Sequence, residues 1–250
     1  MPIPAHETPS APPIEVAGVL FDLDGTLYDQ PKLRRAMVVE LVYAAVRAPR
    51  RTAEAVRRLR LFRSMREELR GPAEDAARAP LGDRQFDVPA ARLGITPEAL
   101  RGTVEEWMFE RPAPALARAA WPGLRPTLTR LRALGLRLGV FSDYPPAAKL
   151  AALGVDDLFD VALGATDADV DAFKPDPAGF LKGAEALGLA PREVVYVGDR
   201  VDVDAEGARR AGMRSVIIDA KRPASPLPSR ADAPRFVRTF AEVYDALTLQ

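Results

Sequence analysis

The stretch "VAGVLFDLDGTLYDQ" (16–30) joins a short apolar run to two closely spaced acids, Asp22 and Asp24. Residues 16–23 are apolar and rich in β-forming residues at their start, which predicts a buried strand. Like charges repel, and a buried carboxylate is costly unless a partner offsets its charge. Two acids at the end of a buried strand therefore predict that another part of the chain, or a bound cation, compensates them.

The composition is that of a globular protein that has no Cys and a single His. Of its 250 residues, 48% are hydrophobic, which suits one large domain or a domain with a sizeable insertion. The chain has no Cys, and its one His, His6, lies in a Pro-rich leader. These counts exclude disulfides and thiolate sites and argue against Ser–His mechanisms. The remaining oxygen ligands favour a hard cation such as Mg²⁺.

Charge and hydropathy give expectations about partners and location. The 35 basic residues balance the 35 acidic ones, so no global field favours nucleic acid or an anionic membrane. Residues 1–15 are rich in Pro and lack a basic region followed by an apolar one, which predicts a disordered tail and not a secretory signal. No apolar run approaches the length of a membrane span. We therefore expect a cytoplasmic protein.

Residues 31–120 carry apolar residues at helical spacing and show no strand pattern. The helices expected there span 32–48, 52–70 and 96–112, with a breaker-rich link at 71–83. The last of them begins with Thr96 as N-cap and Pro97 at the first helical position. The sequence thus predicts an all-helical block inserted after the first strand.

The rest of the chain alternates between strand and helix patterns. Strands are predicted at 136–143, 159–164, 193–199 and 214–219. The helices between and after them are expected at 124–135, 145–154, 176–189, 203–213 and 239–249, with a Pro-rich loop at 221–234. Such alternation indicates a parallel sheet with right-handed crossovers. The predicted fold is α/β: a doubly wound, Rossmann-like core of residues 16–30 and 121–250, interrupted by a helical domain of residues 31–120.

Polar side chains follow the predicted strands at their carboxyl ends, where open α/β sheets form their sites. Asp22 and Asp24 are two residues apart on a strand and so point the same way. The others are Ser142, Asp143, Lys174 in "FKPDP", and Asp199, with Asp202 and Asp204 close behind. A divalent cation would offset the repulsion among these carboxylates, and Lys174 would neutralise more of it.

This set of residues is suited to phosphoryl transfer. With Mg²⁺ shielding the charge, one carboxylate can attack phosphorus, while the second protonates the leaving alcohol and later activates water. Ser142, Lys174 and backbone N–H groups near Gly25 and Thr26 would bind the phosphoryl oxygens. The residues therefore predict a Mg²⁺-dependent phosphatase that acts on a small phosphomonoester.

Four motifs, "DLDGT", "FSD", "KPDP" and "VGDRVDVDAEGARRAGM", occur in this order. They resemble those of the haloacid dehalogenase-like hydrolase superfamily, and the resemblance covers residues 16–30 and 121–220. It implies a Mg²⁺-dependent hydrolase that forms an aspartyl phosphate and carries a cap after the first motif. Residues 31–120 resemble such a cap only in being helical.

The resemblance also implies a role for each matching residue. Asp22 matches the nucleophile, and Asp24 matches the general acid and base that lends its backbone carbonyl to Mg²⁺. Lys174 matches the charge-neutralising lysine. Thr26 and Ser142 match phosphate or orientation positions, Asp199 the metal carboxylate, and Asp204 the second acidic position of that motif. Two residues depart from the pattern: Asp143 stands where relatives often carry Asn, and Arg200 where many carry Ser. Asp143 would change contacts to the leaving group or cap the next helix.

Several functions stay open at this point. A phosphomutase would share the intermediate and transfer the phosphoryl group to a different acceptor. A dehalogenase would share the attack by Asp22, but relatives of that type replace the acid at the position of Asp24. A receiver-type signalling domain has no reason to insert the helical block, and a non-catalytic phosphate-binding module would keep the pocket without turnover. Phosphoglycolate, a sugar phosphate and a nucleotide are all candidate substrates.

Arginine is concentrated in residues 47–70, which hold nine Arg and three Glu. One interpretation is a solvated face of an amphipathic helix. The other is that one or two of these arginines lie over the site and hold an anionic group of the substrate. A nucleic-acid surface is disfavoured, because the helix is short and the whole chain is neutral.

Overall fold

The computed structural model describes residues 16–70, 79–222 and 233–248. The expected disordered tail (1–15) lies outside these residues. So do most of the expected link (71–83) and most of the expected Pro-rich loop (221–234). Within the described part, no helix is both long and apolar enough to cross a membrane.

Six parallel strands form one sheet in the order β3-β2-β1-β4-β5-β6. They are β1 (Gly18–Phe21), β2 (Arg137–Ser142), β3 (Val161–Gly164), β4 (Val194–Gly198), β5 (Arg214–Ile218) and β6 (Arg235–Val237). The order reverses at β1, whose Phe21 is in register with Val140 of β2 on one side and Val197 of β4 on the other. The predicted doubly wound α/β fold is confirmed, and β1 marks the switch point at which such sheets bind ligands.

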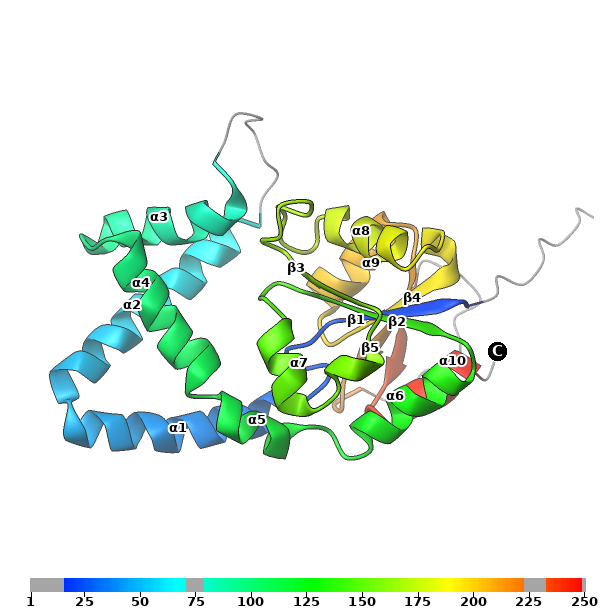
Figure 1. Ribbon diagram of the computed structural model, residues 1–250, viewed down its shortest axis with the longest axis horizontal. Coiled ribbons are helices and arrows are strands. Elements are labelled where there is room, and N and C mark those ends of the chain that lie inside the picture. Colours follow the sequence, from blue (N-terminus) through cyan, green and yellow to red (C-terminus); the bar gives the residue numbers. More distant parts are fainter. Residues whose placement is uncertain (1–15, 71–78, 223–232, 249–250) are drawn as a thin grey trace, which may run out of the picture.

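Helices cover both faces of the sheet (Figure 1). One face carries α8 (Ala178–Ala186) and α9 (Glu206–Arg210); the other carries α6 (Leu124–Ala133), α7 (Ala147–Leu153) and α10 (Glu242–Thr248). Single turns form η2 (Asp156–Leu158), η3 (Pro191–Glu193) and η4 (Val201–Ala205). Alternation along β1 explains the two layers, because successive side chains point to opposite faces. Val19 and Phe21 belong to one buried cluster, whereas Leu20 belongs to the other.

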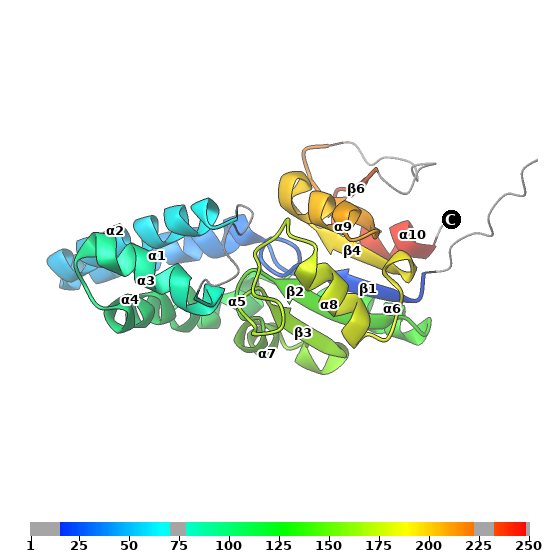
Figure 2. The same cartoon turned by 90° about the horizontal axis from the view of Figure 1, so that it is seen from above.

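The helical block projects from one end of the sheet (Figures 1 and 2). It contains α1 (Gln30–Arg47), α2 (Pro49–Glu68), α3 (Leu81–Leu93), α4 (Pro97–Val104), the π-helical η1 (Glu105–Glu110) and α5 (Ala113–Ala119). A small core of its own joins α2, α3 and α4, in which the rings of Phe62 and Phe86 stack at 5.1 Å between centroids. This block is called the cap below.

The chain enters and leaves the cap through two neighbouring segments. The backbone N–H of Asp29 donates to the carbonyl of Ala119 at 2.9 Å, and Tyr28 forms an antiparallel bridge with Ala120. These contacts support residues 31–120 as the proposed extent of the cap.

The helices α3 and α5 and the strand β6 have no counterpart in the expectation, which ends the last helix of the inserted block at residue 112. The sequence assigns no helix to 84–95, yet α3 covers Leu81–Leu93 with Pro89 inside it; the proline argues against a helix on local grounds, and packing against α2 overrides it. Strand β6 is only three residues long, too short for a periodic signal. By contrast, α4 begins as predicted, with the Thr96 hydroxyl accepting from the Ala99 N–H.

Candidate active site

Asp22 lies directly after β1 and is buried. Its backbone N–H donates to the carbonyl of Val197 at 2.8 Å, which continues the pairing of β1 with β4 by one residue. The Thr26 hydroxyl donates to Asp22 Oδ2 at 3.1 Å. Asp22 Oδ1 accepts from Lys174 Nζ at 2.6 Å. The residue predicted as nucleophile is thus held in a defined orientation by two neighbours that the sequence also singles out.

Lys174 is the central cation of the site. Its side chain is 3% exposed, and its ammonium group contacts Asp22 Oδ1, Asp204 Oδ1 at 2.7 Å and the Tyr196 hydroxyl at 3.0 Å. Tyr196 in turn donates to the carbonyl of Phe141 at 3.0 Å. Burial alone would lower the pKa of Lys174, but the carboxylates of Asp204 and Asp22 raise it well above its usual value. The lysine therefore stays charged within the sheet edge.

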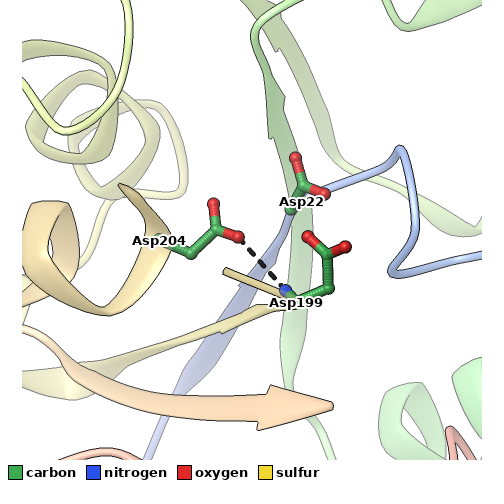
Figure 3. Close-up of side chains that lie close together, drawn as sticks. All are labelled: Asp22, Asp199 and Asp204. Atoms are coloured by element: carbon green, nitrogen blue, oxygen red, sulfur yellow. Dashed lines mark hydrogen bonds between the residues drawn. The ribbon is translucent and has the colours of Figure 1, made fainter. Parts of the chain in front are cut away.

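Asp22, Asp199 and Asp204 form an acidic cluster (Figure 3). One carboxylate oxygen from each lies within 4.8 Å of the others. Asp204 Oδ2 accepts from the backbone N–H groups of Asp199 and Arg200, which fixes the start of η4. Asp199 can approach the cluster because Gly25, at φ +100°, lacks a side chain: a Cβ there would lie 2.3 Å from Asp199 Oδ2.

The electrostatics of the cluster favour a bound cation. Burial raises the pKa of Asp22 well above its usual value. Lys174 lowers the pKa, but the neighbouring carboxylates of Asp204 and Asp199 raise it further. Burial and the neighbouring Asp204 raise the pKa of Asp199 to about 7. Carboxylate oxygens in such proximity are the ligands that Mg²⁺ prefers. The residues present therefore fit Mg²⁺.

Asp24 is not part of this cluster. The prediction that Asp22 and Asp24 point the same way is wrong, because β1 ends at Phe21 and the alternation of a strand does not extend to them. Its Oδ1 accepts from the Tyr28 hydroxyl at 2.7 Å, and both of its oxygens contact Lys149 Nζ, at 2.6 and 2.7 Å. Burial would raise its pKa, but Lys149 and Tyr28 together hold it below the usual value. The predicted contribution of Asp24 to the metal is its backbone carbonyl, so the side-chain position does not bear on it. Neither Lys149 nor Tyr28 was predicted from the sequence as a partner of Asp24. The one sequence feature that pointed to such a contact was the position of Tyr28, four residues after Asp24.

Ser142 and Asp143 stand at the end of β2, as predicted. Ser142 is buried, lines the cavity described below, and accepts the Tyr144 N–H at 3.2 Å. Asp143 accepts the backbone N–H of Lys174 at 3.2 Å and forms an ion pair with Arg70 at 2.7 Å. Its carboxylate thus joins the Lys174 loop to the segment after α2. Thr26 is fully buried beneath Asp22, where it is placed to orient that carboxylate.

Two arginines of the Arg-rich segment connect the cap to the core. Arg66 is buried; it donates to the carbonyl of Asp143 at 2.7 Å and lies over the Tyr144 ring at 3.9 Å. Arg70 donates to the carbonyl of Lys174 at 2.7 Å. The sequence left two roles open for the arginines of residues 47–70: a solvated helix face or a contact to the substrate. The structure gives Arg66 and Arg70 a third role, because their hydrogen bonds hold the end of α2 against the loops that carry Asp143 and Lys174.

A cavity of about 720 Å³ lies between the sheet edge and the cap. Its core side includes Asp22, Asp24, Ser142, Lys174 and Asp199. Its cap side is formed by side chains of α1, α2 and η1. The arrangement can admit a ligand whose one end meets carboxylates and an ammonium group, and whose other end meets the cap.

Comparison with known proteins gives one consistent result. The family model for haloacid dehalogenase-like hydrolases matches residues 16–212. A glyceraldehyde 3-phosphate phosphatase of Methanopyrus kandleri is 32% identical over 206 residues, which cover 81% of this chain and 84% of that protein. A phosphoglycolate phosphatase of Shigella dysenteriae is 32% identical over 221 residues, which cover 81% of each chain.

The fold has a counterpart among solved structures. The crystal structure of a HAD phosphatase from Thermococcus onnurineus matches with a TM-score of 0.60 and 26% sequence identity. The match covers 93% of this chain and 98% of that one, and so includes the cap as well as the core.

Proposed function

The chain belongs to the haloacid dehalogenase-like hydrolase family, and we propose that it is a Mg²⁺-dependent phosphatase that hydrolyses a small-molecule phosphomonoester. The observation that carries this proposal is the cluster of Asp22, Asp199 and Asp204 at one edge of the sheet, where Asp22 and Asp204 pair with Lys174 and the cluster lines a cavity. An oxygen nucleophile beside a buried cation is suited to attack at phosphorus. Relatives named as phosphatases, at about 30% identity, support the same reaction class.

In the proposed reaction, an oxygen of Asp22 attacks the phosphorus atom and the bond from phosphorus to the ester oxygen breaks. Asp24 must carry a proton when substrate is bound, although, against the effect of burial, Lys149 and Tyr28 hold its pKa below the usual value in the free chain. It donates this proton to the ester oxygen, so the leaving group departs as a neutral alcohol. In the second half, Asp24 takes a proton from water, whose oxygen attacks the phosphorus of the aspartyl phosphate. Phosphate leaves, and the carboxylate of Asp22 is restored. Lys174 and Ser142 are placed to bind phosphoryl oxygens during both halves.

Asp22, Asp199 and Asp204 are the side chains that would hold Mg²⁺, together with the backbone carbonyl of Asp24. The chemistry that the ion supplies when bound is neutralisation and orientation of the phosphoryl oxygens. Two other activities would use the same nucleophile: transfer to a second acceptor, as in a phosphomutase, and displacement of halide. Asp24 favours phosphate release, because an alcohol needs a proton to leave and a halide does not.

The test is phosphate release from p-nitrophenyl phosphate and a panel of phosphorylated metabolites, with Mg²⁺ and with excess chelator. We expect chelator to remove the activity and Asp22→Asn to lower kcat at least about a thousandfold. Asp202→Asn is the matched control, because Asp202 lies in η4 near the cluster but is exposed and paired with Arg200. Equal rates for Asp22→Asn and the parent would overturn the assignment of the nucleophile.

A further inference from the structure

The cavity is larger than a phosphoryl group requires, and part of its cap side is apolar. Its volume of about 720 Å³ falls in the range of roughly 300–1,000 Å³ that encloses drug-sized ligands. The apolar side chains come from three elements: Met37 and Leu41 of α1, Leu59 of α2, and Trp107, Met108 and Phe109 of η1. This set is called the apolar wall. A short polar leaving group would leave most of it in contact with water, which is unfavourable.

Two of the cations that line the cavity belong to α2 and lack a protein partner within the described part of the chain. They are Arg60 and Arg63, which are three residues apart and so are neighbours on the helix; Arg63 also follows Leu59 by four residues. Both are exposed, and among the described residues neither forms a hydrogen bond or an ion pair. Arg66 and Arg70, further along the same segment, are tied to the core instead.

The contrast within one helix indicates what Arg60 and Arg63 are for. A guanidinium group presents several donors in a planar fork that matches carboxylate and phosphate oxygens. Two such groups without a protein partner in the described residues, in the same cavity as an apolar surface and the catalytic carboxylates, are suited to a ligand that supplies the anion. The apolar wall of that cavity is suited to a hydrocarbon segment.

We propose that the substrate has an amphipathic leaving group: an apolar body of several carbons that lies on the apolar wall, ending in an anionic group that binds Arg60 and Arg63. This rests on the proposed phosphomonoester hydrolysis and specifies its substrate class. It separates the chain from relatives named for glyceraldehyde 3-phosphate and phosphoglycolate, whose named substrates are short polar esters.

The test uses ethyl, butyl, hexyl and octyl phosphates and the same esters with a terminal carboxylate, with release of phosphate measured in Mg²⁺. We expect kcat/KM to rise about fourfold for each methylene buried on the apolar wall. The terminal carboxylate should lower KM about tenfold for the longer esters, the effect of one charge-assisted contact.

Three variants locate the effect. Arg60→Ala and Arg63→Ala should each raise KM for the long carboxylated esters about tenfold and remove the preference over the plain ester. Arg57→Ala is the matched control, since Arg57 is an exposed arginine of the same helix outside the cavity. It should leave both kinetic constants unchanged.

The outcomes separate the two proposals. Hydrolysis with no dependence on chain length, or with equal KM for plain and carboxylated esters, overturns the amphipathic leaving group and leaves the phosphatase intact. Equal effects of Arg60→Ala and Arg57→Ala do the same. No hydrolysis of any ester, p-nitrophenyl phosphate included, overturns the phosphatase and this inference with it.

Discussion

The two sides of the cavity are built in opposite ways. On the core side, Asp22, Lys174 and Asp204 are buried and hold one another at 2.6 and 2.7 Å. On the cap side, Arg60 and Arg63 are exposed and have no partner among the described residues. The charges of Asp22, Lys174 and Asp204 are thus arranged before any ligand arrives, whereas those of Arg60 and Arg63 are satisfied by water or by a ligand.

This difference is consistent with separate functions for the two sides, chemistry on the core side and recognition of the leaving group on the cap side. Attack at phosphorus requires groups held within a narrow geometry by their own neighbours. Recognition of a leaving group can be changed by side chains that nothing else depends on. A chain with this architecture can keep its reaction while its substrate changes. This requires that the stability of the fold depends on the charged side chains of the core side and not on Arg60 and Arg63 of the cap side.

The largest effect is expected from Lys174→Met in metal-free buffer. Removing the ammonium group leaves Asp22 and Asp204 buried without their cation, at a cost of about 3–5 kcal/mol in the free energy of unfolding. Urea denaturation measures it. Lys182→Met is the control: Lys182 pairs with Asp169 and Glu185 at 3.2 Å on the surface, where such pairs contribute about 0–1 kcal/mol. Similar losses of unfolding free energy in the two variants would show that the ion pairs of Lys174 contribute no more to stability than a surface ion pair does.

Addition of Mg²⁺ should stabilise the folded chain. A ligand that binds only the folded state at a hundred times its Kd raises the free energy of unfolding by about 2.7 kcal/mol. Urea denaturation at increasing Mg²⁺ measures the gain. Asp199→Asn and Asp204→Asn should reduce it, while Asp202→Asn should not. A gain that all three variants retain would place the ion elsewhere.

Much of the core side could be predicted from the sequence, because parallel topology brings the carboxyl ends of neighbouring strands to one edge. Asp22 and Lys174 are 152 residues apart in sequence, yet their side chains meet at 2.6 Å. The alternation of strands and helices was enough to expect this. Asp199 follows from the same rule, since it comes directly after β4, whereas Asp204 lies five residues further along, in η4.

The contacts that the sequence did not reveal depend on packing between separate elements. Lys149 reaches Asp24 from α7, within a helix whose pattern is otherwise apolar. Arg66 and Arg70 meet the core only because α2 crosses the catalytic edge, and no periodicity in α2 indicates where it will lie. Tertiary packing, and not local propensity, also decides α3 despite Pro89.

A smaller change in stability, with a specific effect on the metal, is expected from Gly25→Ala. The left-handed backbone at φ +100° should cost about 1–2 kcal/mol with any side chain. The new Cβ also meets Asp199 Oδ2, so the carboxylate must move and Mg²⁺ affinity should fall about 10- to 100-fold. Calorimetric titration measures the affinity.

The control for this change is Gly135→Ala. Gly135 has φ +83° and nothing within 4 Å of the added Cβ. The two variants should therefore lose similar stability, while only Gly25→Ala weakens Mg²⁺ binding. Unchanged Mg²⁺ affinity in Gly25→Ala would mean that Asp199 does not ligate the ion from the position seen here.

The smallest effect on stability is expected on the cap side. The double variant Arg60→Ala/Arg63→Ala should change the free energy of unfolding by no more than about 0.5 kcal/mol, because exposed side chains without partners contribute little. Arg66→Met, in the same helix, removes buried hydrogen bonds to Gln85 and Asp143 and should cost about 1–3 kcal/mol. Urea denaturation of both variants measures the contrast. A loss in the double variant as large as that of Arg66→Met would mean that Arg60 and Arg63 serve the fold, and that the cap side is no freer to change than the core side.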